Sequence, residues 1–216
     1  MIELSIKIIP TVFLSGGKNM RKFISILFIA MLVFTGVSHA QESPRVVVEK
    51  YLAAVRSNDY DRAYSFISKT DTTIINWLEL IQYVKKITPL KLTEIIDLAH
   101  NAVRQEIVST SVGGNTALVK IHSSIPDMAE TLRVTQNPED IRSLLDRGGL
   151  SMKERFGECT LVVEDGDWKI SRVKDISSDQ AAEIATDFAE LVLGKDEAKR
   201  ISQKIDEFMK KRDKGV

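Results

Sequence analysis

The spacing of apolar residues changes along the chain, and this change limits the fold more than any other feature of the sequence. Between residues 43 and 88, apolar side chains recur every three or four positions, as on one face of an α-helix. Over residues 106–121 and 159–173 they alternate with polar side chains, as in half-buried β-strands. From residue 179 onward the helical spacing returns. Helices followed by hairpins and a final helix predict an α+β fold.

Three helices are predicted before the first strand. The first begins at Ser43-Pro44, where a capping hydroxyl precedes a proline at the first helical position. Asp59 or Asp61 caps a shorter second helix. Asp71 opens a third, whose apolar residues cover more than half of its circumference, so we expect it to be packed on two sides. Residues 90–103 fit either a short helix or an irregular stretch.

Two hairpins are predicted. The first turns at Gly113-Gly114 or at Gly114-Asn115. Both registers place the same residues on one face, namely Val108, Thr110 and Val112 with Ala117, Val119 and Ile121. The second turns at Asp165-Gly166, a strong two-residue turn signal. This turn pairs Val163 with Trp168 and Leu161 with Ile170 on one face, and Thr160 with Ser171 on the other.

Two further segments lie outside this helix-and-hairpin pattern. Residues 126–155 have the character of an insertion, with a helix that is capped at Asn137 and ends at Gly148-Gly149. Residues 179–216 form a C-terminal helical extension, broken or kinked at Gly194. We expect this extension either to fold back on the domain or to dock on a partner, another protomer or a membrane surface. The candidates for such docking are Ile201, Ile205 and Phe208.

The first forty residues are predicted to be a leader. Residues 20–40 start with Met20-Arg21-Lys22, continue with about fifteen almost wholly apolar residues and end at Ser38-His39-Ala40, the layout of a secretory signal cleaved near Ala40. The apolar run is shorter than the roughly 20 residues that a membrane span needs. We therefore expect a periplasmic or secreted bacterial protein that touches a membrane only through this signal, unless the signal stays uncleaved. Residues 1–19 are interpreted as a misassigned extension of a chain that starts at Met20.

Charge and cysteine content exclude several classes of protein. The chain has 30 basic and 30 acidic side chains. Residues 1–40 hold four of the basic and one of the acidic groups, so the remaining 176 residues carry 26 and 29 and are net negative. A dedicated nucleic-acid-binding protein needs a basic excess instead. A single cysteine, Cys159, forms no internal disulfide, and neither His100 nor His122 has a partner at metal-ligand spacing. We expect no metal and no cofactor.

Several stretches of the sequence resemble the nuclear transport factor 2-like superfamily. They are Ser43-Pro44, VVEKYLAAV at residues 47–55, NDYDRAY at 58–64 and DGDWKI at 165–170. The resemblance covers roughly residues 43–175 and is nearest to small exported bacterial domains grouped with lumazine-binding-like proteins. It implies residues 41–178 as one domain, with a strongly curved antiparallel sheet, or cone, around the first helix and a pocket at the open end. Because this superfamily contains enzymes, ligand binders and interaction modules, the fold does not select a function.

For such a pocket we select five aromatic residues as candidates: Tyr51, Tyr64, Trp77, Tyr83 and Trp168. The function we expect is binding of a small apolar ligand or a protein partner, with a homodimer as one form of partner. The alternative is a small enzyme of the isomerase or dehydratase type, which would need carboxylates and acidic donors in the pocket. Its groups would come from Tyr51, Tyr64, Tyr83, Asp97 and Glu106. No motif places these together, so no catalytic residue is assigned.

The contents of the pocket would distinguish these functions. Two or more buried carboxylates, or a histidine facing one cavity, would favour the enzyme. An all-apolar cavity would favour a binder, and a filled cone would favour a structural or interaction module. Cys159 is expected to be a buried, inert thiol, because no cationic group stands beside it in the sequence. Ser171 and Lys174 have the spacing of some acyl-enzymes, but a strand directs them apart.

The leader prediction gives a defined product. Protein recovered from the periplasm or the medium should begin at Gln41, because Ser38 and Ala40 supply the small residues before the cleavage site. N-terminal sequencing and intact mass measure this directly. A blocked-processing precursor should begin at Met20, and a precursor beginning at Met1 would show that residues 1–19 are translated.

Overall fold

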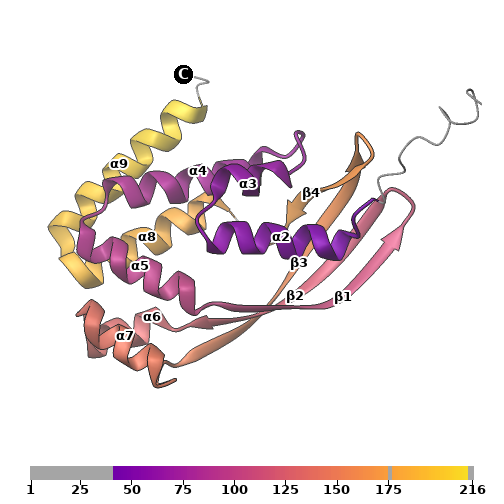
Figure 1. Ribbon diagram of the computed structural model, residues 1–216. Coiled ribbons are helices and arrows are strands. Elements are labelled where there is room, and N and C mark those ends of the chain that lie inside the picture. The colour runs from indigo at the N-terminus through magenta and orange to yellow at the C-terminus, as the bar shows by residue number, and fades with distance from the viewer. Residues whose placement is uncertain (1–40, 175–176, 214–216) are drawn as a thin grey trace, which may run out of the picture. The chain divides into compact units, whose positions relative to one another are not determined.

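The chain divides into two units, Met1–Ala40 and Gln41–Val216, and the second is described below. The computed structural model describes residues 41–174 and 177–213, so the predicted extension, signal and cleavage site lie outside the described residues. The described part is α+β, with eight helices and four strands (Figure 1). In chain order they are α2 (Pro44–Arg56), α3 (Tyr60–Ser65), α4 (Thr72–Ile87), α5 (Leu90–Ala102), β1 (Arg104–Gly113), β2 (Thr116–Pro126), α6 (Met128–Val134), α7 (Pro138–Asp146), β3 (Met152–Glu164), β4 (Asp167–Val173), α8 (Ser178–Leu193) and α9 (Lys195–Asp213).

The first helices begin where their capping residues predict. The side chain of Ser43 accepts a hydrogen bond from the main chain at the start of α2, and Asp59 and Asp71 do the same for α3 and α4. A fourth helix, α5, then precedes the sheet, so the expected number of three N-terminal helices is not confirmed. Residues 90–103 form this helix because they bury Leu92 and Ile95 completely.

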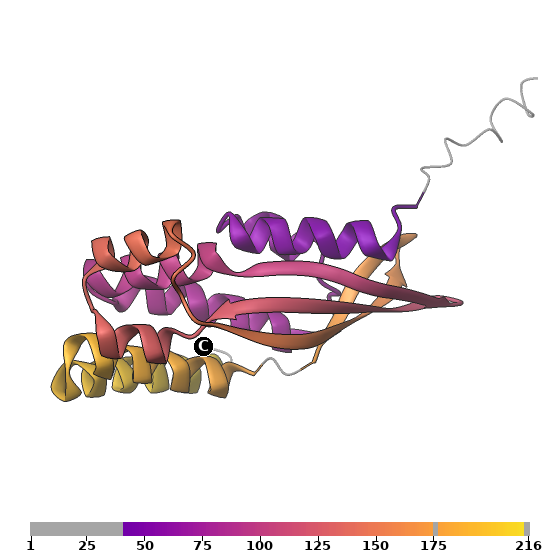
Figure 2. The ribbon, with the colours of Figure 1, turned by 90° about the horizontal axis from the view of Figure 1, so that it is seen from below.

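The four strands form one open antiparallel sheet in the order β1-β2-β3-β4. Gly113 pairs with Thr116, so the first hairpin turns at Gly114-Asn115. The second turns at Asp165-Gly166, where both residues have positive φ, 53° and 89°. Figures 1 and 2 show α2 along one face of the sheet, the hairpin turns at one end, and helices α5–α9 at the other end.

The first hairpin departs from the predicted alternation at one position. Ile107 lies opposite Ile121 and Ser109 lies opposite Lys120, so Val108 is an extra, bulged residue. The prediction that Val108 shares a face with Ile121 is therefore wrong, and Val108 is 56% exposed. Toward the turn the prediction is confirmed, because Val112 lies opposite Ala117, although Val112 is itself 59% exposed.

The second hairpin follows its predicted register near the turn. Val163 pairs with Trp168, and Leu161 pairs with Ile170. A register shift between Thr160 and Leu161 then places Arg172 opposite Thr160, so the predicted pairing of Thr160 with Ser171 is wrong. Strand β4 pairs with β3 only from Cys159 onward, so residues 152–158 of β3 extend past the last paired residue of β4.

Two separate hydrophobic cores hold the described residues together. One lies between the sheet and α2, α3 and the first half of α4, with Val48, Leu78, Val119, Leu161 and Ile170 at its centre. The other lies among α4, α5, α6, α7, α8 and α9, with Leu80, Leu92, Ile95, Ile141, Ile201 and Ile205 fully buried. Helix α4 contributes to both cores, which confirms that it is packed on two sides.

The C-terminal segment folds back on the domain as two helices. Gly194, with φ 85°, ends α8, and α9 then packs against α8 and α4. Ile201 and Ile205 are each 1% exposed, and the ring of Phe208 stacks on Tyr83 with centroids 4.3 Å apart. The three residues selected as candidates for partner docking are thus engaged within the chain. Their stripe meets α4 rather than an open face of the sheet.

The described part of the chain contains no helix that is both long and apolar enough to cross a membrane.

Because α9 is packed in the helical core, a substitution on its buried face should lower stability more than a substitution on the exposed face of α8. Ile205→Ala should lower the free energy of unfolding by about 2–5 kcal/mol, because it opens a cavity in the helical core. Ile184→Ala on α8, where the side chain is 55% exposed, should change it by less than about 1 kcal/mol. Urea unfolding of both variants measures this. Equal effects would show that α9 is not integral to the fold.

Candidate functional site

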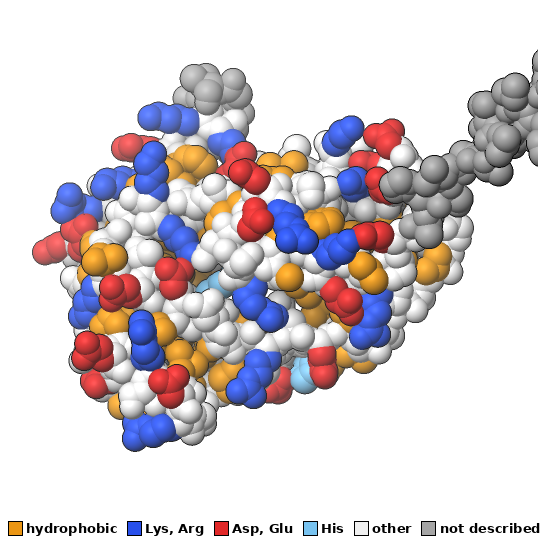
Figure 3. All heavy atoms as spheres, viewed as in Figure 1, with side chains coloured by type: hydrophobic (Ala, Val, Ile, Leu, Met, Phe, Trp, Pro, Cys, Tyr) orange, Lys and Arg blue, Asp and Glu red, His pale blue; other side chains and the backbone are white. Residues whose placement is uncertain are grey.

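A pocket of about 380 Å³ lies between the inner face of the sheet, α2 and the end of α5. Helix α2 contributes Tyr51, Leu52, Val55 and Arg56, helix α4 contributes Trp77, and the end of α5 contributes His100 and Val103. The strands contribute Gln105, Ile121, Ser123, Ile125, Arg155, Phe156, Gly157, Glu158, Cys159 and Val173, followed by Lys174. Apolar groups also show in Figure 3 in the gap between α2 and the strands, among interspersed basic and acidic side chains.

The inner face of the sheet is arranged in rows that cross neighbouring strands. Ile107, Ile121 and Gly157 are aligned across β1, β2 and β3. The next row toward α5 is polar and consists of Gln105, Ser123 and Arg155. The pocket floor therefore changes from apolar to polar along the strands.

Gly157 leaves room for the pocket. It occupies an inward-facing position of β3 opposite Ile121. A Cβ added at Gly157 would meet no heavy atom within 4 Å. The missing side chain thus leaves open space beside an otherwise apolar floor, which is one of the recognised uses of glycine within a strand.

Tyr51 presents a hydroxyl to this pocket. The residue is 3% exposed, and burial raises the pKa of its phenol, so the group stays protonated. Within the described residues this hydroxyl makes no hydrogen bond, yet no buried side-chain oxygen there lacks a partner. The oxygen must therefore be accessible, and because Tyr51 lines the pocket, we place it at the pocket surface.

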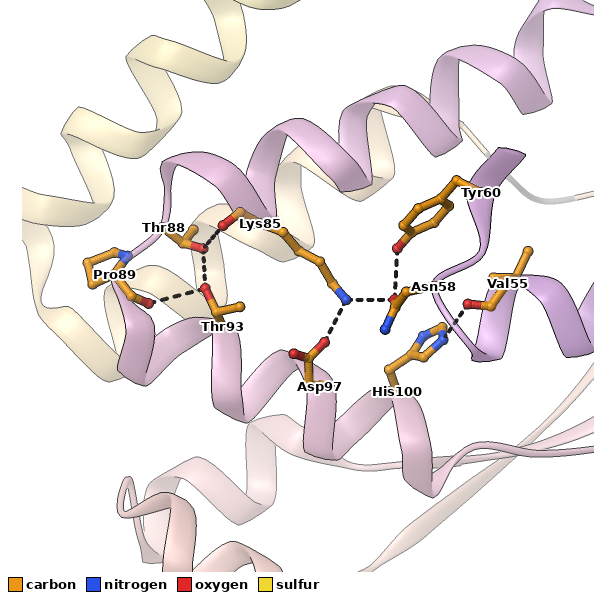
Figure 4. A network of polar contacts seen from close by, with 9 residues as sticks. All are labelled: Val55, Asn58, Tyr60, Lys85, Thr88, Pro89, Thr93, Asp97 and His100. Carbon is orange, nitrogen blue, oxygen red and sulfur yellow. Dashed lines mark hydrogen bonds and ion pairs between the residues drawn. The ribbon is translucent and has the colours of Figure 1, made fainter. Parts of the chain in front are cut away.

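His100 enters the pocket from the last turn of α5. Its Nε2 lies 3.1 Å from the main-chain oxygen of Val55 (Figure 4). Because a carbonyl only accepts hydrogen bonds, Nε2 carries the proton. Burial lowers the pKa of this imidazole, and the nearby cations Lys85 and Arg56 lower it further against the opposing effect of that bond. His100 is therefore a neutral donor at neutral pH.

A polar network fixes the helices that carry these residues (Figure 4). Nζ of Lys85 on α4 lies 2.5 Å from Oδ1 of Asp97 on α5 and 2.8 Å from Oδ1 of Asn58. The hydroxyl of Tyr60 donates to the same Asn58 oxygen at 3.0 Å. The contacts join α4, α5 and the turn after α2, and so hold the pocket's helical wall in place.

Three cations and one carboxylate line the pocket. The cations are Arg56, Arg155 and Lys174, and the carboxylate is Glu158. Glu158 lies 4.0 Å from Nζ of Lys120 and 3.8 Å from Nζ of Lys174. Its charge is thus shared by two lysines, whereas the two arginines have no ion pair or hydrogen bond from their side chains within the described part of the chain.

Cys159 lines the pocket as a buried thiol. It is 1% exposed, and burial raises its pKa to about 12. A thiol with this pKa holds its proton at neutral pH and is a poor nucleophile.

Of the five aromatic pocket candidates, Tyr51 and Trp77 line the pocket. Trp168 is buried in the core beneath the sheet, 7% exposed. Tyr64 packs on the edge of that core, and its hydroxyl accepts a hydrogen bond from Gln82. Tyr83 lies on the half of α4 that joins the helical core, where it stacks on Phe208. These three rings therefore serve packing.

The carboxylates considered for an enzyme are not brought together. Asp97 pairs with Lys85, and Glu106 pairs with His122 on the outer face of the sheet, 3.0 Å from its Nδ1. Ser171 and Lys174 are also separately engaged, the first with the main chain of Thr160. Among the residues described, no group of three or more His, Cys, Asp or Glu side chains is placed to hold a metal ion.

Sequence reasoning missed the polar half of the site. Gln105, Ser123, Arg155 and Gly157 belong to strand ends that were not predicted, since β3 was expected to start only at Cys159. The run from Met152 to Glu158 is charged and contains a glycine, so it carries a weak strand signal, and its pairing with β2 fixes it as a strand. An isolated glycine ahead of an alternating strand was the one available signal.

A second hollow, of about 640 Å³, lies beside the loop between α6 and α7. It is wide open, and Lys91, Thr135, Gln136 and Asn137 are among its lining residues. With no enclosing apolar wall, it is a weaker candidate for a ligand site.

No protein-family model matches the chain, and no curated protein matches it.

The two histidines of the domain are predicted to titrate on opposite sides of their usual pKa of 6.5. Burial lowers the pKa of His100, and a hydrogen bond to Glu106 raises that of His122. His100 therefore favours folding above pH 6.5 and loses this contribution as the pH falls, whereas His122 favours folding at low pH and loses its contribution as the pH rises. A proton NMR titration measures both, with His100→Gln and His122→Gln as assignment controls. A pKa above 6.5 for His100 would contradict its buried, neutral placement.

Proposed function

We propose that this chain is an exported, non-catalytic domain of the nuclear transport factor 2-like type, and that it binds a small, largely apolar ligand in the pocket between α2 and the sheet. The observation that carries the proposal is the open space at Gly157 within an apolar floor. A pocket of about 380 Å³ lies within the roughly 300–1,000 Å³ of small-molecule sites. Export rests on the leader sequence alone.

Two features support the assignment to this fold type. Helix α2 lies against a bulged antiparallel sheet, and the C-terminal half of α2 lines the pocket, which in this proposal is the open end of a cone. The residues that suggested the resemblance in α2 and the second hairpin are also core residues of this layer, among them Val48, Tyr51 and Ile170. In this proposal the helical core of α5–α9 is an addition to the cone.

An isomerase- or dehydratase-type enzyme is the second candidate, because His100 faces the pocket. Its Nε2 is engaged with Val55, so a proton could be taken only at Nδ1. Glu158, the carboxylate of the pocket lining, is shared with two lysines rather than held as a buried base. His100 by itself would favour the enzyme, but its engagement with Val55 and the presence of one carboxylate in the pocket lining are the reasons we propose binding.

Filling the space at Gly157 tests the proposed function. Gly157→Leu should lower the affinity for N-phenyl-1-naphthylamine, an uncharged apolar fluorescent probe, by about tenfold or more, because its side chain occupies the pocket. Fluorescence titration of the purified domain measures this affinity.

The matched control is Gly113→Leu at the far end of β1, where an added Cβ also meets nothing within 4 Å. It should leave probe affinity unchanged. Circular dichroism and a thermal melt confirm that both variants fold. If the unaltered protein does not bind the probe, or if both variants bind it equally well, the pocket is not an apolar ligand site.

A further inference from the structure

We propose that the ligand is an amphiphile with an oxyanion head, such as a carboxylate or a phosphate, whose head lies at the polar row of Gln105, Ser123 and Arg155 and whose apolar chain extends along Ile121 and Gly157. This inference rests on the proposed function, because it names the ligand class of the same pocket. It adds the charge of the ligand's head, the direction in which the ligand lies in the pocket, and the residues that would bind the head.

The direction comes from the order of the rows on the sheet. Beneath α2, the floor is formed by Cys159 beside Val173, followed by Ile121 beside Gly157. The row of Gln105, Ser123 and Arg155 comes next toward the end of α5. An amphiphile that buries its chain over the apolar rows therefore brings its head to the polar row.

The chemistry of the head comes from hydrogen-bond donors without partners. Within the described residues, the side chains of Arg56, Arg155, Gln105 and Ser123 make no hydrogen bond, and neither does the hydroxyl of Tyr51. All five can donate, and the two arginines are donor-rich, whereas the phenol offers a single O–H. A ligand that presents several acceptor oxygens would satisfy them together, and guanidinium groups match carboxylate and phosphate geometry.

Several charged groups elsewhere on the sheet are paired, although the side chains of Arg104 and Arg172 have no partner within the described residues. On the outer face His122 lies 3.0 Å from Glu106 and 2.7 Å from Glu154. At the pocket rim Glu158 compensates Lys174. Arg56 and Arg155 therefore remain as uncompensated cations. The carboxyl end of α5 carries a partial negative charge that offsets part of this excess, so we expect a monoanionic or dianionic head rather than a polyanion.

The state of His100 is consistent with a positive pocket. Lys85 and Arg56 both act to lower its pKa, and its Nε2 hydrogen is already given to Val55. An anion bound near Arg56 should oppose that effect and raise the pKa of His100. This response reports the charge of the bound head and is independent of affinity.

Displacement of N-phenyl-1-naphthylamine by three single-chain ligands tests the inference. Decanoate should displace the probe at a concentration about tenfold or more below that needed for decanol, because only decanoate satisfies the unpaired donors. Decyltrimethylammonium, with a cationic head, should be weaker than both. Decyl phosphate should compete like decanoate if any oxyanion serves, and a difference between the two identifies the preferred head.

Arginine variants then locate the head. Arg155→Gln and Arg56→Gln should each weaken decanoate by about tenfold while changing decanol by less than about twofold. Arg62→Gln on α3, outside the pocket, is the matched control and should change neither. Unchanged decanol binding shows that each variant still folds. In the unaltered protein, decanoate should raise the pKa of His100 in an NMR titration, and decanol should not.

The two proposals fail in different ways. Equal displacement by decanoate and decanol, or arginine variants that weaken both alike, would overturn the anionic head and leave an apolar pocket. Preference for decyltrimethylammonium would also overturn it. Absence of probe binding altogether would overturn the proposed function instead.

Discussion

The burial of α4 on two sides is the constraint on which the rest of the fold depends. Leu78 belongs to the core beneath the sheet, and Leu80 belongs to the core among the helices, so one helix contributes to two cores that have no residue in common. Helix α5 packs in the second core, and β1 of the sheet starts directly after its last turn. The pocket exists at this junction because neither core fills it.

The polar groups of the protein are satisfied in two distinct ways. On the outer face of the sheet and between α4 and α5, several charged groups are paired, as with Lys85 and Asp97 or His122 and Glu106. At the pocket, Tyr51 and Arg155 are left without partners in the described structure. Arg155 is exposed, so water solvates its guanidinium in the free protein, and the group is open to an acceptor that a bound molecule supplies.

Those parts of the fold that depend on local signals were predictable from the sequence. Caps at Ser43, Asp59 and Asp71 and the turn at Asp165-Gly166 act through neighbouring backbone groups, and the structure has elements starting at each. Residues 90–103, which form α5, were left open between a short helix and an irregular stretch, and α6 was not predicted although Asp127 caps it locally. The first half of β3 was not predicted, because its pairing with β2 fixes it as a strand. The bulge at Val108 is of the same kind, since its register depends on β2.

The residues of the site also divide into those that local signals predict and those that depend on distant partners. Tyr51 and Trp77 were predictable as large aromatic residues on helices that border a pocket in the resembling fold. Arg155 and Gly157 were not, because their inward direction depends on a register of β3 that is set by β2 rather than by their own residues. Tyr83 was predicted to line the pocket, but its ring stacks on Phe208 in the helical core.

The protonation states in the pocket are a reason for proposing binding rather than catalysis. Burial keeps Tyr51 and Cys159 protonated, and His100 is neutral with its Nε2 hydrogen bonded to a main-chain oxygen. None of these groups has a pKa tuned toward a proton-transfer task in the way that a general acid or base requires, and a lowered pKa makes His100 a weaker base. The groups that remain charged are arginines, which hold their protons at all ordinary pH values. A fixed positive field beside an apolar floor can orient and retain an amphiphile, and it needs no change of protonation to do so.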